Sequence, residues 1–296
     1  MNSAAYIPIR NKRAKNRGQT PRIWIVIVLA QPHAEEIFKH YNSPAIAAGY
    51  GHQEYITPCE RLLFSTYISP GMAILDIGVG GGRTSQYLAR NASRYVGVDY
   101  APEMVRICRR KYPQWEYLEA SATDLSCFSD ESFDVIVMSY NVLDDLVPDA
   151  SRWRCLQECR RLLENKGFLI FSSHNPRALI TRPEPAEPRQ DNSAHLAGRI
   201  LVLLRLVADY VAIYFTVICS SLHKVVRYGL RSPFWRGEGY MLDTEKLMTH
   251  FWTPKKAIAE LGRYGFRFIA LQGDDYPKRS YQMITDWYYY VFMKLS

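Results

Sequence analysis

The stretch AILDIGVGGGRT at residues 73–84 decides the fold that the sequence predicts. It begins with Ala73–Ile77, a short apolar run of the kind found in a strand that is covered on both faces. The glycines that follow let the backbone turn sharply and approach a ligand closely, because glycine has no side chain and tolerates positive φ. A helix is expected from about Arg83 to Arg90. Since nucleotide-type ligands bind at such strand-to-helix edges, the stretch predicts a site of that kind.

Apolar runs and helical segments continue to alternate after this unit. Further strands are expected at Tyr95–Val98, Trp115–Leu118, Phe133–Met138 and Phe168–Ser172. One helix is expected from Pro102 to about Lys111, and another from Asp149 or Ser151 through Leu163, closed by Lys166-Gly167. A helix from Thr253-Pro254 and a closing strand pair, Phe266–Leu271 and Trp287–Met293, complete the pattern. Parallel neighbours need crossover connections, which helices supply. The sequence therefore predicts an α/β fold with a doubly wound, mostly parallel sheet.

Two acids accompany the glycine loop. The dinucleotide fingerprint G-x-G-x-x-G fits badly, because its last position falls on Arg83 or Ser85. The pattern D-x-G-x-G-x-G does fit, and its defined positions are Asp76, Gly78, Gly80 and Gly82. Asp99 ends the next predicted strand, where a carboxylate can accept two hydrogen bonds from a ribose diol. Together the loop and Asp99 predict a nucleoside pocket.

In these motifs the chain resembles the class I S-adenosylmethionine-dependent methyltransferases, over about residues 63–171 and again over 253–296. The resemblance implies S-adenosyl-L-methionine as cofactor and a seven-stranded sheet with an antiparallel last strand. It also implies a set of cofactor contacts. Gly78, Gly80 and Gly82 would line the methionine end, with Asp76 beneath them, and Asp99 would bind the ribose hydroxyls. Tyr100, Ser121 and Ala122 would lie near the adenine. Ser121 stands where the family often has an acid, so a charged adenine contact is missing at that position.

Polar residues after the fourth and fifth predicted strands would face the transferable methyl group. His174 is the candidate general base, because histidine ordinarily titrates near neutrality. Tyr140 and Asn141 are candidates for orienting the acceptor or the cofactor, and His250 is a further candidate at the end of the insertion. Hydrogen bonding within the strand-end loop is the alternative explanation for His174, and ordinary packing is the alternative for His250. The tetrapeptide of Asp or Asn, Pro, Pro and an aromatic residue is absent, so an O-methyltransferase is preferred over a methyltransferase for nucleic-acid bases or amides.

Four segments are expected along the chain. Residues 1–30 form a basic and apolar extension, 31–175 the cofactor-binding part, 176–250 a helical insertion after the fifth strand, and 251–296 the last helix and the closing strand pair. Within the insertion, Ile200–Leu222 has apolar residues at helical spacing. This helix fits a cover over an apolar or amphipathic small-molecule, lipid or glycan-type acceptor, and it fits a homodimer interface equally well.

The charge of the chain is concentrated at its start. Residues 1–22 contain six basic residues and no acid, so the rest carries a net charge of only +2, against +8 for the whole chain. A nearly neutral body disfavours a nucleic-acid partner. The apolar run 23–30 is too short to span a bilayer, which needs about 20 residues, although it allows peripheral membrane contact. Six cysteines without a CxxC pair indicate reduced thiols, a cytoplasmic protein and no metal site.

Three other functions remain open at this point. A nicotinamide-dependent oxidoreductase could use the same kind of sheet, although the glycine spacing disfavours it. A non-catalytic methyltransferase-like binding subunit would keep the pocket without the chemistry. An RNA methyltransferase could use the basic N-terminal arm.

Overall fold

The structure is a computed structural model. It describes residues 34–178, 237–242, 247–281 and 283–296, together with Val211, Phe215, Ile218 and Cys219. The N-terminal extension and most of the predicted insertion, including nearly all of the apolar helix at 200–222, lie outside the described residues. The three described apolar residues of that helix are helical, and their side chains are exposed.

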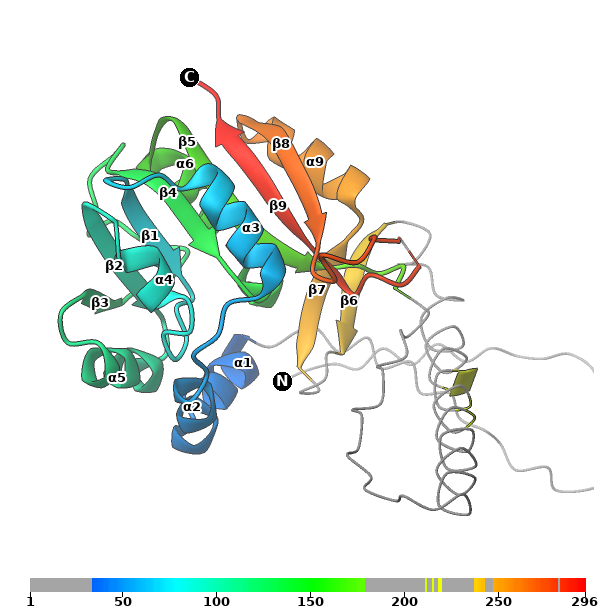
Figure 1. The fold of residues 1–296 in the computed structure, drawn as a ribbon, viewed down its shortest axis with the longest axis horizontal. Coiled ribbons are helices and arrows are strands. Elements are labelled where there is room, and N and C mark those ends of the chain that lie inside the picture. The colour runs from blue at the N-terminus through cyan, green and yellow to red at the C-terminus, as the bar shows by residue number, and fades with distance from the viewer. Residues whose placement is uncertain are drawn as a thin grey trace, which may run out of the picture. The chain divides into compact units, whose positions relative to one another are not determined.

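Seven strands form one mixed sheet in the order β3-β2-β1-β4-β5-β9-β8 (Figure 1). Their bounds are β1 Ala73–Ile77, β2 Arg94–Asp99, β3 Glu116–Glu119, β4 Phe133–Met138, β5 Leu163–His174, β8 Phe266–Gly273 and β9 Trp287–Lys294. The first five strands pair in parallel, and β9 is antiparallel to β5 and β8. The predicted fold class is confirmed. Strand order reverses between β1 and β4, and ligands of open α/β sheets bind at the carboxyl ends of strands at such a point.

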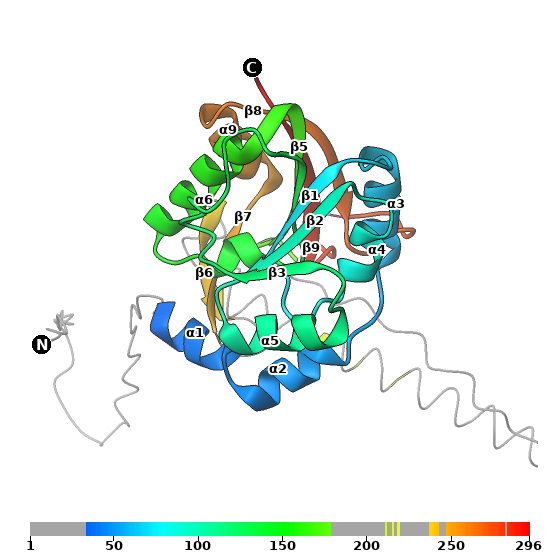
Figure 2. The ribbon, with the colours of Figure 1, turned by 90° about the vertical axis from the view of Figure 1, so that its left-hand side faces the viewer.

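Helices cover both faces of the sheet (Figure 2). Their bounds are α3 Pro58–Tyr67, α4 Ser85–Ala89, α5 Pro102–Lys111, α6 Asp149–Leu162 and α9 Pro254–Arg263. The first three pack on one face and the last two on the other. Successive residues of a strand point to opposite faces, so Ile74 joins the α3–α5 side and Leu75 the α6–α9 side. Burial of both faces explains why the strands read as continuous apolar runs.

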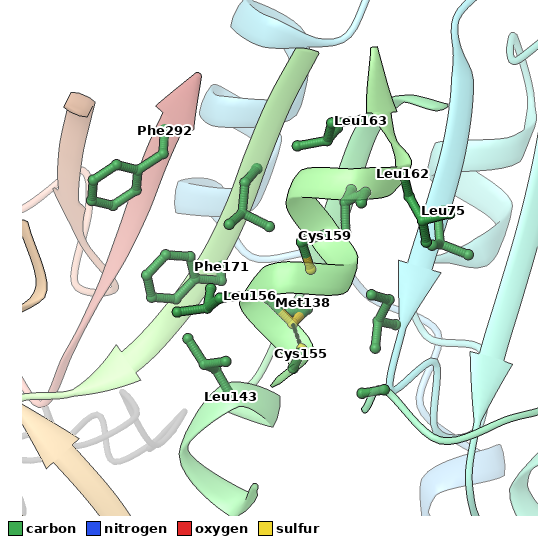
Figure 3. Close-up of a cluster of buried hydrophobic side chains, with 14 of the residues drawn as sticks. Leu75, Met138, Leu143, Cys155, Leu156, Cys159, Leu162, Leu163, Phe171 and Phe292 are labelled. Atoms are coloured by element: carbon green, nitrogen blue, oxygen red, sulfur yellow. Dashed lines mark hydrogen bonds between the residues drawn. The ribbon is translucent and has the colours of Figure 1, made fainter. Parts of the chain in front are cut away.

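The core on the α6 side is densely packed around β4 and β5 (Figure 3). Phe171 is fully buried and stacks on Tyr290 and Phe292, with ring centroids 5.0 and 5.9 Å apart. Cys155 and Cys159 lie in the same core, and the Cys155 thiol approaches the sulfur of Met138 at 3.8 Å. The hydrogen bond with Cys155, together with burial, raises the pKa of the Cys159 thiol well above its usual value. These two cysteines are therefore core thiols.

Two short helices precede the sheet. They are α1 Ala34–Tyr41 and α2 Pro44–Gly51, and α2 packs on α5 through Ala47 and Ile107. The next helix, α3, begins at Pro58, because Thr57 and Glu60 form a reciprocal capping box there. The segment between α2 and α3 is therefore extended and runs past the glycine loop.

The end of α6 differs from the prediction. The helix ends at Leu162, and β5 begins at once with Leu163 paired to Phe133, so Lys166-Gly167 lies inside the strand and does not close the helix. A register shift between Phe133 and Val135 accommodates the irregular start of β5, where Lys166 has φ +66°.

A second feature that the sequence did not predict is a hairpin at the end of the insertion. Strands β6 Glu238–Leu242 and β7 Met248–Trp252 form a separate two-stranded antiparallel sheet. Strand β7 packs against β5 and against a short 3-10 helix, η1 Val142–Asp145, which follows β4. The hairpin thereby brings His250 to the carboxyl ends of β4 and β5. No helix in the described part of the chain is both long and apolar enough to cross a membrane.

Candidate active site

The glycine loop is tied to the ends of β1 and β2. The backbone N–H groups of Gly78 and Val79 both donate to the carbonyl oxygen of Val98, at 2.8 and 3.0 Å. Gly80 has φ +54°, and a Cβ placed there would have only a tyrosine ring atom of α2 within 4 Å, at 3.8 Å. The left-handed backbone and the open space at this position suit close approach of a ligand.

At two other positions of the loop, the absence of a side chain allows other parts of the protein to pack closely against the backbone. A Cβ on Gly78 would lie 2.5 Å from the side chain of Val142 in η1, and one on Gly81 would lie 2.4 Å from the backbone of Tyr50 in α2. These glycines therefore let η1 and α2 close onto the loop. Of the three glycines that the resemblance assigns to the cofactor, Gly80 has the most open surroundings, whereas Gly82 is bordered by Cys108 at 3.2 Å.

Asp99 points at the glycine loop. Its Oδ2 accepts a hydrogen bond from the backbone N–H of Gly80, and its Oδ1 accepts one from that of Ala101, both at 2.9 Å. Burial raises the pKa of Asp99 to about 6, although the hydrogen bonds from the backbone oppose the shift. Each carboxylate oxygen has a second lone pair, so Asp99 can still accept hydrogen bonds from a sugar diol at the rim of the loop.

Asp76 lies beneath the loop and is only 1% exposed. Its Oδ2 accepts hydrogen bonds from the Thr84 hydroxyl at 2.7 Å and the Tyr95 hydroxyl at 3.0 Å. Burial raises the pKa of Asp76 to about 6. Through these contacts Asp76 connects the loop to β2.

The predicted adenine end is formed by loops after β2 and β3. The ring of Tyr100 is 37% exposed and lies 5.5 Å from that of Phe38 in α1. Ala122 is buried, whereas Ser121 is exposed and shares a hydrogen bond of 2.8 Å with the hydroxyl of Thr123. Burial raises the pKa of Tyr100 above its usual value. Tyr100 and Phe38 together present aromatic surface at this end.

His174 and Asp144 form a hydrogen-bonded pair at the carboxyl ends of β4 and β5. Asp144 Oδ2 accepts from the backbone N–H of His174 at 2.8 Å and lies 2.9 Å from Nδ1 of the same residue. Burial alone would raise the pKa of Asp144, but the hydrogen bond from His174 and the nearby His250 ring hold it below its usual value. An ionised Asp144 keeps the proton of a neutral His174 ring on Nδ1, so that Nε2 is the basic nitrogen.

Asn141 lies on the Nε2 side of His174. The amide nitrogen of Asn141 is 3.3 Å from Nε2, and its backbone N–H donates to the hydroxyl of Ser172 at 2.7 Å. Its side-chain oxygen is buried and has no hydrogen-bond partner among the described residues. A buried acceptor of this kind needs a donor, which a bound amine or hydroxyl would supply.

Tyr140 precedes Asn141, and both residues have left-handed backbones, with φ +58° and +62°. Two successive non-glycine residues in this region store strain, which clusters at functional sites. The Tyr140 hydroxyl shares a hydrogen bond of 2.7 Å with that of Tyr55, and its ring lies 5.7 Å from Trp287. The guanidinium of Arg83 is 4.0 Å from the ring centroid of Tyr140. The site next to His174 is therefore lined with aromatic surface.

Arg83 is held by a buried ion pair with Glu60. The two side chains are 8% and 0% exposed, and Arg83 donates to both carboxylate oxygens at 2.5 and 2.8 Å. The Tyr289 hydroxyl also donates to Glu60, at 2.8 Å. Burial raises the pKa of Glu60, but the bonds from Arg83 outweigh it and leave the pKa lowered. This pair fixes the aromatic site to α3 and β9.

Several of these residues escaped the sequence analysis. The Tyr41 hydroxyl of α1 donates to Asp145 at 3.0 Å, and Thr249 of the hairpin donates to the other oxygen of Asp145 at 2.9 Å. Burial raises the pKa of Asp145 to about 6. Two adjacent acids after the fourth predicted strand were the available signal for Asp144 and Asp145. Nothing in the sequence indicated that α1 reaches them.

A separate groove of about 680 Å³ lies on the α3–α4 side of the sheet. Its lining includes Tyr55, Tyr87 and Trp115, but neither Asp99 nor the open glycine of the loop. It shares Tyr55 and Arg83 with the aromatic surface beside His174 and is otherwise separate from the candidate site. In the described part of the chain, no three histidine, cysteine or acidic residues are grouped to hold a metal ion.

The sequence also matches known proteins. The family model described as a methyltransferase domain matches residues 75–171, which hold the glycine loop, Asp99, Asn141 and Asp144. This segment forms a class I S-adenosylmethionine-dependent methyltransferase domain. The match covers most of the first segment on which the resemblance rested, about residues 63–171, and S-adenosyl-L-methionine is the cofactor of that family. Three observations fit such a cofactor: the open space at Gly80, the orientation of the Asp99 carboxylate toward the loop, and the Asn141 side-chain oxygen, which has no hydrogen-bond partner among the described residues.

Curated relatives match between about a third and a half of this chain. An uncharacterized methyltransferase from Synechocystis sp. is 32% identical over 110 residues, which are 37% of this chain and 50% of the relative. A ubiquinone biosynthesis O-methyltransferase from Cereibacter sphaeroides is 34% identical over 148 residues, 49% of this chain and 58% of the relative. The chain thus spans about half the length of the curated relatives it matches.

Solved structures share the fold over a longer stretch. The CcbJ methyltransferase from Streptomyces caelestis has a TM-score of 0.55 at 14% identity and covers 87% of this chain and 98% of its own. The 1,6-didemethyltoxoflavin-N1-methyltransferase from Burkholderia thailandensis has a TM-score of 0.53 at 13% identity, covering 90% and 92%. At these identities the likeness establishes the fold alone.

Proposed function

We propose that this methyltransferase transfers a methyl group from S-adenosyl-L-methionine to a hydroxyl of a small, apolar or amphipathic acceptor, with His174 as the general base. The observation that carries the proposal is the pair of contacts between Asp144 and His174, which hold the imidazole in one orientation. Transfer to an alcohol requires removal of the acceptor proton, whereas binding alone requires no base. The name of the O-methyltransferase relatives agrees with an oxygen acceptor.

The cofactor contacts proposed for this chain follow the geometry of the loop. Asp99 would accept from the ribose hydroxyls, Gly80 would border the methionine end, and Tyr100 would flank the adenine. Asn141 would accept a hydrogen bond from the cofactor amine or from the acceptor, which would satisfy its side-chain oxygen. When bound, the cofactor supplies an electrophilic methyl group on a positively charged sulfur.

The chain's own residues would do the rest. Nε2 of His174 would take the acceptor proton as the oxygen attacks, and the anionic Asp144 would stabilise the resulting imidazolium. Tyr55, Tyr140 and Trp287 would hold an apolar acceptor beside His174 and limit the access of water. The positive Arg83 would stay in its ion pair with Glu60 and support the Tyr140 ring from behind.

The proposal is tested with a cell extract as the source of acceptors. The wild-type chain and the cofactor should convert at least one small molecule into a product heavier by one CH₂ group. His174→Gln should lower the rate of that conversion by about 10²–10⁴-fold, because a positioned base contributes that much. Asp144→Asn should also lower the rate, because an amide cannot fix the required tautomer.

Asp130→Asn serves as the matched control, because it removes an exposed carboxylate that pairs with Arg161 before the start of β4, at the opposite edge of the sheet. Calorimetry with S-adenosylhomocysteine confirms that each variant is folded. Unchanged activity in His174→Gln, with cofactor affinity retained, would refute the base. If no small molecule gains mass while the cofactor binds, a non-catalytic role replaces the proposal.

A further inference from the structure

A second histidine reaches the buried carboxylate behind the proposed base. His250 of β7 is fully buried, with Nδ1 3.7 Å from Asp144 Oδ1 and Nε2 3.4 Å from Glu238 Oε1. His174 occupies the other oxygen, Oδ2, of the same Asp144. The two imidazoles therefore lie on opposite oxygens of one carboxylate. Glu238 is 25% exposed, so the line of side chains runs from the reaction site to solvent.

Packing alone does not explain this arrangement. The His250 ring is in edge contact with Trp252 and Tyr240, at 5.1 and 5.6 Å between centroids, which an apolar ring would make equally well. An imidazole between two carboxylates is different, because a proton on each nitrogen gives each acid a charged partner. Nδ1 has no hydrogen-bond partner among the described residues, and its nearest acid is Asp144.

We propose that His250 is a positioning residue for methyl transfer. It shares the negative charge of Asp144 with His174, and it thereby sets how readily His174 releases the proton that it takes from the acceptor. The inference rests on the proposed function, in which His174 is the base. When His250 is protonated, its positive charge opposes a second positive charge on His174 across the same carboxylate. Proton release from His174 is then easier, and the base is regenerated after each transfer.

Charged and titratable groups lie near His250 or near the acids and the tyrosine that it faces. They are Glu238 and Tyr240 on β6, Asp144 and Asp145 on η1, His174 on β5, Asp149 and Arg152 on α6, Lys256 on α9 and Tyr290 on β9. Asp149 is bound by Arg152 and Tyr240, and Lys256 binds Glu238 at 3.2 Å. Asp144 and Glu238 are the acids in direct reach of the His250 ring.

The test is an NMR titration of the histidine rings in the full chain without cofactor, which needs no knowledge of the acceptor. The His174 signal is assigned by its disappearance in His174→Gln. In His250→Gln the His174 midpoint should move upward by about one pH unit, because a like charge nearby disfavours the protonated form of His174 and the substitution removes that charge. Glu238→Gln should move it in the same direction by less, because His250 then loses one of the two acids that hold its proton.

Tyr240→Phe is the matched control, because it keeps the ring against His250 and removes only the hydroxyl that contacts Asp149 and Arg152; the His174 midpoint should stay in place. An unchanged or lowered midpoint in both His250→Gln and Glu238→Gln would overturn the inference and leave His250 as a packing residue. If His250→Gln fails to fold, Glu238→Gln alone decides. Failure of the proposed function would instead be seen as full methyl transfer by His174→Gln, whatever the NMR result.

Discussion

Replacement of Asp99 by alanine should weaken cofactor binding more than any single substitution within the glycine loop. The carboxylate lies at the rim of the glycine loop, where both oxygens accept a backbone N–H at 2.9 Å. A ribose diol would add two charge-assisted hydrogen bonds, each contributing roughly 1.5–3 kcal/mol. Loss of both at the lower value is about 3 kcal/mol, which corresponds to a Kd about 100-fold higher.

The assay is calorimetric titration with S-adenosylhomocysteine, which lacks the transferable methyl group and is stable during the experiment. Glu116→Ala is the control, because Glu116 is an exposed carboxylate at the opposite edge of the sheet and makes only a 3.9 Å pair with Arg94. Asp99→Asn is a poor control, since its NH₂ group would face the N–H of Gly80 or Ala101. Equal Kd values for wild type and Asp99→Ala would refute the ribose assignment.

The same carboxylate makes cofactor binding depend on pH. Burial raises the pKa of Asp99 to about 6, so the group gains a proton as the pH falls through that value and loses its charge and part of its accepting capacity. Affinity of the wild-type chain should therefore fall below about pH 6. Asp99→Ala should lack this component, and an identical pH profile for both proteins would contradict the reasoning.

Three further changes test other parts of the structure. Burial raises the pKa of Asp76 to about 6, so the folded state binds more protons than the unfolded state between pH 4 and 6, and the wild-type chain loses stability as the pH rises. Between pH 4 and pH 7, the free energy of urea unfolding of the wild type should fall by about 2 kcal/mol relative to that of Asp76→Asn. An equal difference between the two proteins at both pH values would contradict the assignment. Phe171→Ala should lower the free energy of unfolding by about 3–5 kcal/mol, because the ring is fully buried against Tyr290; a loss below 1 kcal/mol in the same assay would contradict this. Gly81→Ala should cost about 1–3 kcal/mol, because the new Cβ would lie 2.4 Å from the backbone of Tyr50, and unchanged stability would show that α2 does not pack there.

The sequence predicted the sheet because its signals are local. Apolar runs such as Phe133–Met138 mark strands buried on both faces, and Pro254 after Thr253 marks a helix start, and both elements were found at those positions. Asp99 could also be placed, because the carboxyl ends of neighbouring parallel strands share one edge of a sheet. These inferences need only the pattern of apolar residues along a strand and the residue types that begin or end an element.

The missed features depend on contacts between distant parts of the chain. The partners Asp144 and His174 are 30 residues apart, and Tyr41 and Asp145 are 104 apart, so neither pair leaves a pattern in the sequence. The β6–β7 hairpin was missed because its strands are short and mix Gly, Glu and Thr with apolar residues. His250 could be named as a candidate, but its position behind Asp144 required the hairpin.

The central claim is that a nucleoside bearing a sulfur group binds between the glycine loop and Asp99, with its sulfur toward His174. A crystal structure of the chain with S-adenosylhomocysteine tests this directly. We expect the ribose hydroxyls within hydrogen-bond distance of the Asp99 carboxylate and the sulfur on the side of Asn141 and His174. A ligand found in the groove between α3 and α4, or bound without contact to Asp99, would contradict the account.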